Sequence, residues 1–325
     1  MTNEESNTYP ISWLCGLVTS SSILSIIVII IMGNCIVIWT ILHDNRLRQQ
    51  HQYWIVASLA IADLSVGLIV MPMTLIYEIW KKWVLGLVLC EIWLALDVLF
   101  VTSSNLHICA IAIHRFVSMK FPVKYASLPH NKVTTITIIL AWLLSLIISL
   151  PPLIGWRHQQ RNQECVISSD LGYVLYSASG SFYIPITIIL FVYWRIHKIT
   201  DEYSRRRLRE SYRCSKVLEQ SQSLSGDSDN VLQQRRETIH KKLRNKERQA
   251  TFLIGLILIG FIALWLPFFT LYVIGGFGYS LPDEVFQPIF WLGYFNSGVN
   301  PIIYAVFSPD FKQAFNREFK HFITL

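Results

Sequence analysis

The sequence predicts an all-α protein, a seven-transmembrane helix bundle with a short amphipathic membrane-surface helix after span seven. The chain of 325 residues is 53% hydrophobic and only 15% charged, whereas soluble domains carry about 25% charged residues. Seven apolar segments recur along it, and each has about the 20 residues that cross a bilayer as a helix. The total length suits one such bundle, so residues 1–325 are treated as a single domain.

The seven predicted spans are joined by short polar loops, apart from one long polar stretch between spans five and six. The spans cover residues 14–42, 53–77, 88–119, 132–154, 171–198, 250–275 and 285–307. Pro72, Pro185 and Pro267 lie within spans two, five and six. Because proline lacks the N–H that a helix interior requires, we expect each of these helices to bend at its proline.

The basic residues predict how the chain lies in the membrane. Of the 28 Lys and Arg residues, one predicted face holds only Lys81, Lys82, Arg157 and Arg161. The positive-inside rule assigns the other, basic-rich face to the cytoplasm. Residues 1–12 are then extracellular, whereas loop 199–249, which is partly disordered, and the segment 308–325 are cytoplasmic. We expect a multi-pass protein of the plasma membrane. Its net charge of +7 is explained by the membrane topology and by attraction to anionic lipid, and not by nucleic-acid binding.

The segment after span seven carries an apolar stripe between basic residues. Its phenylalanines recur every three or four positions: Phe311, Phe315, Phe319 and Phe322. This pattern is typical of a helix that lies on a membrane surface and binds lipids. The segment 308–325 contains no cysteine for a palmitoyl chain, so we expect side chains alone to anchor it.

Six cysteines are scattered along the chain without metal-ligand spacing. Cys90 opens span three and Cys165 precedes span five. Both fall on the predicted extracellular face, where disulfides persist, so we predict that they pair. Cys15, Cys35 and Cys109 lie in spans, where a small apolar role is expected.

Asp97 lies deep in span three, about two helical turns after Cys90. A carboxylate at that depth costs about 2.5–3.5 kcal/mol to insert, and intramembrane charges usually face a cavity and meet a cation there. One interpretation is an ion pair with another span, but Arg115 and Arg195 both lie at span ends. The favoured interpretation is a carboxylate that faces a cavity and binds a cationic ligand. Asp63 in span two is a second intramembrane acid.

A set of motifs follows one another along the spans. It comprises Gly33-Asn34, Leu59 to Asp63, Cys90, Arg115, Trp142, Cys165, Pro185, Tyr193, Trp265-Leu266-Pro267 and Asn300 to Tyr304. In this order the motifs resemble those of the rhodopsin-like G-protein-coupled receptors. The resemblance covers every span and excludes the long inner loop and the termini. Within the family the chain is most similar to the biogenic-amine group, and residues 150–156, 172–185 and 291–297 resemble alpha-adrenergic and invertebrate octopamine receptors. Residues 265–272 and 289–297 look most like the octopamine branch.

The resemblance implies a site for a protonated amine agonist. The implied ligand residues are Asp97, Val98, Ser177, Ser181, Trp265, Phe268, Phe269, Tyr272, Phe290, Trp291 and Tyr294. Asp97 would hold the ammonium in a charge-assisted bond, and the aromatic faces would add cation–π contact. Ser177 and Ser181 lie four residues apart on one helix face and would meet a phenolic or β-hydroxyl group. The alternative is that each serine hydroxyl bonds its own helix backbone.

Octopamine is the favoured ligand, and tyramine, dopamine, serotonin and noradrenaline are the alternatives. The resemblance also implies a polar network that holds an allosteric sodium ion in this family. Its residues here are Asn34, Asp63, Ser104, Asn296, Ser297 and Asn300. A water-filled network is the alternative. No other metal and no other cofactor is expected.

The resemblance implies a heterotrimeric G protein and arrestin as partners. Their coupling residues would be His114, Arg115, Tyr193, Glu247 and Tyr304. Three positions depart from the family pattern: His114 replaces an acid, Asn105 replaces an apolar residue near Pro185 and Phe261, and Leu264 replaces a cysteine. A neutral histidine cannot act as an anion for Arg115, so we expect raised agonist-free signalling. In the alternative, His114 packs by hydrogen bonding and basal activity stays low.

Other functions fit the sequence less well. A transporter or channel could use Asp63 and Asp97 to line a path, but the chain shows no inverted repeat and no paired broken spans. An intramembrane enzyme would need a catalytic set, and no Ser/His/Asp, metal or Gly-Asp set stands in the sequence. A receptor-like protein with poor or constitutive coupling remains an alternative because of His114 and Asn105.

Overall fold

The computed structural model describes residues 9–156, 165–221, 252, 255–279 and 282–323, leaving aside the side chains of residues 9–19, 126, 203–204, 206–221, 283–284 and 321–323. Every element in these ranges is helical. The elements are α1 (Tyr9–His43), α2 (Asn45–Arg48), α3 (Gln52–Ser65), η1 (Val66–Val70), α4 (Met71–Trp80), α5 (Leu87–Lys120), α6 (Pro122–Ala126), α7 (His130–Ser149), α8 (Pro151–Ile154), α9 (Leu171–Ala178), η2 (Ser179–Tyr183), α10 (Ile184–Ser221), the Gly255–Gly276 helix, α12 (Asp283–Phe307) and α13 (Pro309–Ile323).

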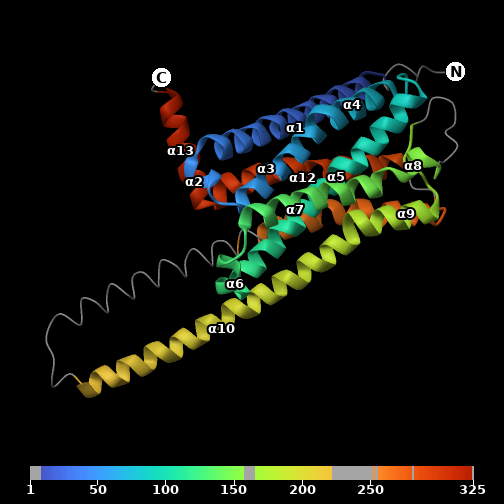
Figure 1. Cartoon of the computed structure of the whole chain (residues 1–325). Helices are drawn as coiled ribbons and strands as arrows, with labels where there is room; N and C mark the ends of the chain where they lie inside the picture. Colours follow the sequence, from blue (N-terminus) through green and yellow to red (C-terminus); the bar gives the residue numbers. More distant parts are fainter. Residues whose placement is uncertain (1–8, 157–164, 222–251, 253–254, 280–281, 324–325) are drawn as a thin grey trace, which may run out of the picture.

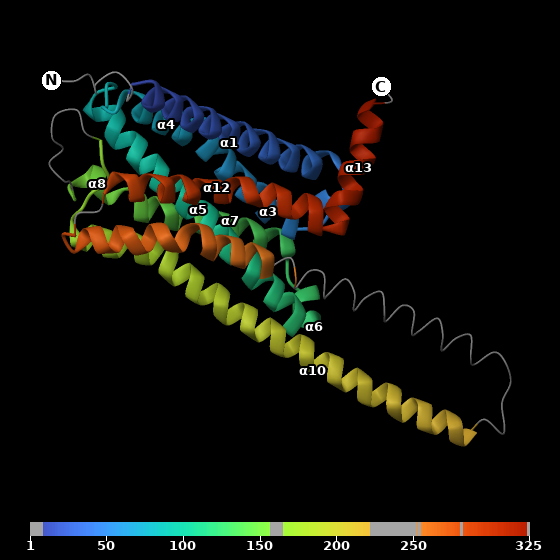
Figure 2. The ribbon, with the colours of Figure 1, turned by 180° about the vertical axis from the view of Figure 1, so that it is seen from behind.

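The long helices form one bundle, with α5 running through its middle (Figures 1 and 2). Within the described residues, six helices are long and apolar enough to cross a membrane: 20–43, 52–80, 87–120, 130–149, 171–202 and 255–276. The seventh, α12, packs along α1 and α3. Large apolar side chains such as Leu24, Leu143 and Ile147 remain exposed on the bundle surface, as expected where lipid replaces water. The predicted seven-helix architecture is therefore confirmed.

Spans two and five each contain a π-helical turn before a proline. In span two, η1 precedes Pro72, which lies in the first turn of α4. In span five, η2 precedes Pro185. A π turn inserts one extra residue into a helix and often marks a functional site. The helix type therefore changes from π to α next to each of these two prolines, where the sequence predicts a bend.

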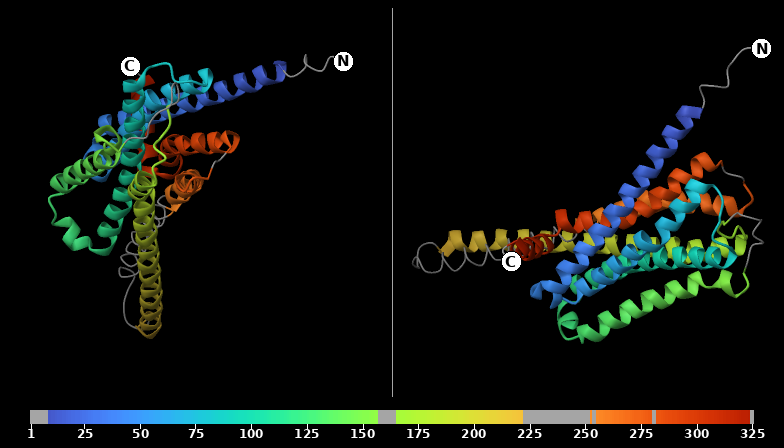
Figure 3. Two further views of the ribbon diagram at one scale, coloured as in Figure 1. Left: turned by 90° about the vertical axis from the view of Figure 1, so that its right-hand side faces the viewer. Right: turned by 90° about the horizontal axis from the view of Figure 1, so that it is seen from above.

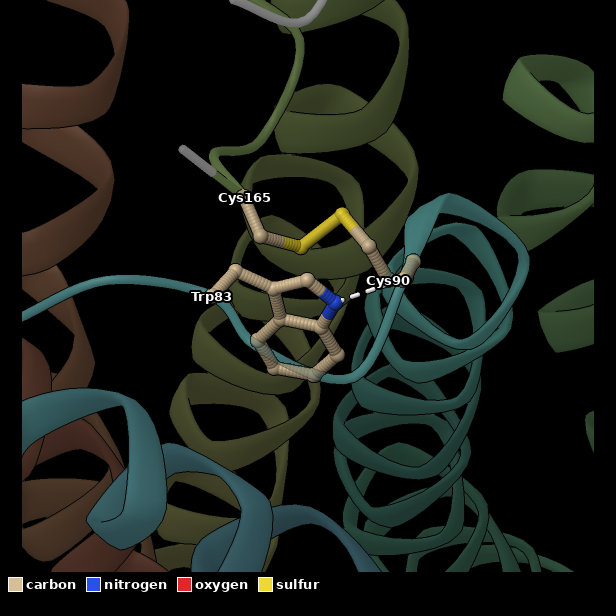
Figure 4. The surroundings of a disulfide bond; sticks show 4 residues. Trp83, Cys90 and Cys165 are labelled. Carbon is tan, nitrogen blue, oxygen red and sulfur yellow. Dashed lines mark hydrogen bonds between the residues drawn. A yellow bond between two sulfur atoms is a disulfide. The ribbon is translucent and has the colours of Figure 1, made fainter. Parts of the chain in front are cut away.

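One end of the bundle is closed by the Cys90–Cys165 disulfide, and we call it the disulfide end. The bond joins residues 75 positions apart and brings their Cα atoms within 5.8 Å, which confirms the predicted pair. The indole of Trp83 lies beside it (Figure 4), stacks on Trp93 at 4.9 Å and donates to the Gly86 carbonyl at 2.7 Å. The disulfide therefore holds the chain before α9 against the start of α5.

The opposite end, called the α13 end, carries the amphipathic helix. There α13 turns away from α12 and runs across the bundle (Figures 1 and 2). Phe311 is buried, whereas Phe315 and Phe319 stack on each other at 5.5 Å, with Phe319 exposed. The phenylalanine stripe therefore packs against the bundle at Phe311 and is exposed at Phe319. The side chain of Phe322 lies outside the described residues.

The fifth span continues far past the bundle at the α13 end. Two further views show α10 projecting beyond the other helices (Figure 3), and it ends at Ser221. The first part of the long loop between spans five and six is therefore a helical extension of span five. Residues 222–251, which include Glu247 and the rest of the loop that the sequence predicts to be partly disordered, lie outside the described residues.

Candidate functional site

A cavity opens between the helices near the disulfide end. It encloses about 430 Å³ of space, counting its opening. The lining residues are Asp97, Val98, Val101, Thr102, Ile167, Ser177, Ser181, Trp265, Phe268, Phe269, Tyr272, Phe290 and Tyr294. Ten of the eleven predicted ligand residues are among them. The exception, Trp291, is not part of the lining, but its ring packs against that of Tyr294 with the centroids 5.8 Å apart.

Three lining residues are absent from the sequence prediction. Val101 and Thr102 lie about one turn after Asp97 and Val98, so helical periodicity could have found them. Ile167 comes two residues after Cys165, and it reaches the cavity because the disulfide ties that segment to α5. Only the disulfide could have signalled this position.

Asp97 is the one carboxylate on the cavity wall, and its side chain is buried. Its Oδ1 atom has no hydrogen-bond partner in the described part of the chain. No ion pair of Asp97 with Lys or Arg is present among the described residues. A structural ion pair with another span is thus not formed there, and the carboxylate remains available to a cation that enters the cavity.

Aromatic rings from the Gly255–Gly276 helix and α12 form the wall facing Asp97. Phe268 stands at the centre, with ring centroids 5.7 Å from Trp265 and 5.6 Å from Phe290. A Cβ atom on Gly293 would lie 2.7 Å from the Trp265 ring. Glycine is therefore required at this position of α12 for the indole to reach the cavity floor. Such a wall suits an aromatic ring or an organic cation.

The two serines of span five have different partners. Ser177 donates to the Tyr173 carbonyl at 2.8 Å, and its oxygen lies 3.3 Å from the Tyr272 hydroxyl. Ser181 instead lies 2.7 Å from the Thr102 hydroxyl. The backbone bond considered from the sequence is thus present at Ser177, whereas the Ser181 hydroxyl bonds α5.

A buried polar network lies between the cavity and the α13 end. Asn300 donates to Oδ2 of Asp63 at 2.9 Å, and Asn34 donates to the Ser297 carbonyl at 3.1 Å. All six predicted members are buried: Asn34, Asp63, Ser104, Asn296, Ser297 and Asn300. Within the described chain, Oδ1 of Asp63 accepts no hydrogen bond, and the hydroxyl of Ser104 neither donates nor accepts one. One carboxylate oxygen and one hydroxyl oxygen that lack hydrogen-bond partners fit a hard cation such as sodium.

The predicted coupling residues lie toward the α13 end. His114 bonds the Tyr125 hydroxyl at 2.8 Å, and Arg115 beside it is half-buried. Tyr193 is half-buried, and a Cβ atom on Gly255 would lie 2.8 Å from its hydroxyl oxygen. Tyr304 is buried. Glu247, the expected partner of Arg115 from span six, lies outside the described residues.

Comparison with known proteins places this architecture in one family. A family model described as "7 transmembrane receptor (rhodopsin family)" matches residues 33–304. The Alpha-1A adrenergic receptor of Mus musculus is 36% identical over 88% of this chain and 64% of its own length. The Probable G-protein coupled receptor No18 of Amphibalanus amphitrite is 35% identical over 91% of this chain and 88% of its own length.

The chain therefore spans just under two thirds of the length of the adrenergic relatives that it matches. The family model nevertheless covers most of this chain, including every residue that lines the cavity. Its members are receptors and not enzymes. On these grounds the chain belongs to the rhodopsin family of seven-transmembrane receptors.

Proposed function

We propose that this chain is a plasma-membrane receptor for a protonated biogenic amine, octopamine or a related phenolic amine, that signals through heterotrimeric G proteins. The observation that carries the proposal is the buried Asp97 carboxylate, which faces an aromatic cavity without an ion pair among the described residues. An amine is cationic at pH 7 and would complete that pair by a charge-assisted hydrogen bond. The alpha-1A adrenergic relatives support an amine-type ligand by their names.

The cavity is matched to the two ends of an arylalkylamine. Asp97 on α5 would take the ammonium, and Phe268 and Phe290 would pack on the aromatic ring. Ser177 and Tyr272 also line the cavity, with their hydroxyl oxygens 3.3 Å apart, and would meet a ring hydroxyl. The binding free energy then comes from one buried charge pair plus apolar burial.

The path from the cavity to the α13 end supports a signalling role. Trp265 on the cavity floor lies 5.6 Å from Phe269, and Phe182 packs against Phe269 at 4.7 Å and Phe261 at 5.4 Å. A ligand that shifts Trp265 would move this packed column and tilt the Gly255–Gly276 helix, because close-packed rings cannot deform independently. We propose that the disulfide end faces outside, and that the α13 end binds the G protein and arrestin.

We also propose that the Asp63 network holds an allosteric sodium ion. Asp63 and Ser104 would supply ligating oxygens, and Asn300 would orient the carboxylate through its 2.9 Å hydrogen bond. A bound cation there would stabilise one arrangement of α3, α5 and α12, because oxygens of Asp63 on α3 and Ser104 on α5 would hold it while Asn300 on α12 fixes the carboxylate.

A panel of octopamine, tyramine, dopamine, serotonin, noradrenaline and histamine tests the proposed function. Cells expressing the full chain would be read by calcium and by cyclic AMP, with untransfected cells and Asp97→Asn as controls. We expect octopamine or tyramine to act at the lowest concentration, and the response to be lost in Asp97→Asn. Silence to all six amines at normal surface expression would contradict the proposal.

A further inference from the structure

One face of α10 changes from aromatic to cationic within two helical turns, close to the α13 end. Phe191, Trp194, Arg195 and Lys198 occupy positions i, i+3, i+4 and i+7, which share one side of a helix. This side looks away from the bundle, since Phe191, Trp194 and Lys198 are exposed and α10 lies at the edge of the bundle (Figures 1 and 2). The apolar span that includes α10 ends at Glu202, so the face lies where membrane hydrocarbon meets the lipid headgroups.

The cations of this face are held at an indole ring. Nζ of Lys198 lies 4.0 Å from the centroid of the Trp194 ring, and the guanidinium carbon of Arg195 lies 5.9 Å from it. No ion pair of either cation with an acid is present among the described residues. Both cations therefore keep N–H donors for an anion, and a phosphate is the anion that a lipid headgroup offers at this depth.

Two acids follow the cations by about one turn, and they differ in their partners. Oδ2 of Asp201 lies 3.4 Å from Nδ1 of His197. Glu202 is exposed, lies four residues after Lys198 on the same side of the helix, and forms no ion pair with a described cation. The ammonium of Lys198 does not approach it, because that ammonium is directed to the Trp194 ring in the opposite direction. The face thus presents positive charge and then, about 5.4 Å farther along the helix, a free negative charge.

This order of charges matches one class of membrane lipid. In phosphatidylethanolamine the phosphate lies next to the acyl region, and a two-carbon arm places a primary ammonium farther out. That ammonium can donate N–H bonds to a carboxylate, whereas the quaternary ammonium of phosphatidylcholine has no N–H to donate. Phosphatidylserine carries a further carboxylate that Glu202 would repel, and phosphatidylglycerol has no cation for Glu202.

We infer that this face of α10 binds the headgroup of phosphatidylethanolamine in the membrane leaflet at the α13 end. The phosphate lies at Arg195 and Lys198, the ammonium at Glu202, and the acyl chains along Phe191 and Trp194. Recognition depends on both charges of the headgroup, so general attraction of a basic protein to anionic lipid does not replace it. The inference requires a membrane-spanning chain and does not depend on which ligand enters the cavity.

A series of headgroups on identical acyl chains tests the inference. It comprises phosphatidylethanolamine, its N,N-dimethyl derivative, phosphatidylcholine, phosphatidylserine and phosphatidylglycerol. The purified full-length chain in detergent receives two lipids at equal concentration, and native mass spectrometry measures the ratio in which they bind. We expect phosphatidylethanolamine to exceed phosphatidylcholine by about fivefold, as one hydrogen bond between charged groups allows. The dimethyl derivative, which keeps one N–H, should lie between them, and the two anionic lipids should bind less than phosphatidylethanolamine.

Matched variants separate the two charges of the site. Glu202→Gln should reduce the preference for phosphatidylethanolamine to within about twofold and leave phosphatidylcholine binding unchanged, whereas Asp201→Asn, one residue away, should keep the preference. Lys198→Gln should weaken both lipids alike, and Lys124→Gln on α6 should weaken neither. All four side chains are exposed, so equal melting temperatures are expected and would show that the fold is unchanged.

Three results would overturn the inference. The first is a preference for phosphatidylserine or phosphatidylglycerol that is lost in Lys198→Gln, which would make this a site for anionic lipid. The second is an unchanged preference for phosphatidylethanolamine in Glu202→Gln. The third is equal binding of all five lipids, which would leave Trp194 and Lys198 as an interfacial anchor without lipid selectivity. None of these results bears on the amine panel, so failure of this inference is distinct from failure of the proposed function.

Discussion

The hydroxyl of Tyr125 lies 2.8 Å from Nε2 of His114, and the two rings meet edge to face at 5.2 Å. This bond ties α6 to α5 next to Arg115, at the position where the resemblance places an acid. A neutral imidazole can fix the loop in this way, but it offers Arg115 no negative charge. The hydrogen bonding considered in the alternative is therefore present, and its effect on basal activity is a separate question.

We expect His114→Asp to lower agonist-free second-messenger output per surface receptor by about threefold. A carboxylate there would pair with Arg115, and a partly exposed ion pair contributes up to about 1 kcal/mol to the resting state. His114→Asn is the matched control, since it can still bond Tyr125 without adding charge, and its output should equal that of wild type. Unchanged or raised output in His114→Asp would show that this position does not set the basal signal.

Asp44 and Arg317 join two segments of the α13 end that lie 273 residues apart. Oδ1 of Asp44 caps α2 by accepting from the amides of Arg46 and Leu47, both at 2.9 Å, while Oδ2 accepts from Arg317 Nε at 3.1 Å. Burial raises the pKa of Asp44, but Arg317 and the backbone amides together hold that pKa below its ordinary value of 3.8. The carboxylate is therefore charged at physiological pH.

This contact should hold α13 in place. We expect Arg317→Gln to speed amide hydrogen exchange in residues 309–319 by about threefold or more, since a charge-assisted bond is lost. Asp44→Asn keeps the cap and loses the charge, so it should match Arg317→Gln, and the double variant should add little. Independent, additive effects of the two substitutions would contradict a direct link.

The pH dependence of this contact has a defined sign. Because the folded-state pKa of Asp44 is lowered, the stabilisation is present above the unfolded pKa of about 3.9 and is lost as pH falls through the folded value. Protection of residues 309–319, corrected for intrinsic exchange, should therefore show no Asp44-dependent change between pH 8 and pH 5. A loss of protection within that window that disappears in Asp44→Asn would contradict this assignment.

Sodium should stabilise the receptor through Asp63. We expect 150 mM NaCl to raise the melting temperature of the purified chain by about 2 °C relative to choline chloride, as binding of a weak ligand to the folded state predicts. Asp63→Asn, which can still contact Asn300, should abolish the difference. If NaCl raised the melting temperature equally in wild type and in Asp63→Asn, the sodium effect would arise at the protein surface. The network around Asp63 would then be filled by water and not by sodium.

Hydrophobic length and the order of motifs predict most of the fold. Apolar composition predicts all seven spans. Six of them are strongly apolar helices in the structure, whereas the seventh, α12, is less apolar because it carries Asn296, Ser297 and Asn300, and it is placed by the motif order and by its packing on α1. The π turns were not predicted, because helix type depends on how neighbouring helices satisfy the carbonyls that Pro185 and Pro72 leave open.

The lining of the site was predicted better than its bonding. Helical spacing and family resemblance place ten of the predicted ligand residues on the cavity, but spacing cannot say which partner a hydroxyl chooses. Ser177 and Ser181 share a residue type and a helix, yet one bonds Tyr173 and the other bonds Thr102. The Asp44–Arg317 contact was missed for the same reason, since no local pattern connects residues so far apart in sequence.

Amine affinity at Asp97 tests the central claim most directly. Truncation of one partner of a buried charge pair costs about 2–5 kcal/mol, so Asp97→Ala should weaken binding of octopamine or tyramine by at least about thirtyfold. Asp97→Asn preserves the shape of the side chain but not its charge, so it should lose a similar amount of amine affinity. Asp201→Asn removes an exposed charge on α10 and should bind the amine as tightly as wild type does. All variants should reach the cell surface.

The measurement is the dissociation constant of the most potent amine of the panel for wild type and the three variants, at equal surface expression. The account predicts a loss of thirtyfold or more in both Asp97 variants and none in Asp201→Asn. Amine affinity that stays within threefold of wild type in Asp97→Ala would contradict the account.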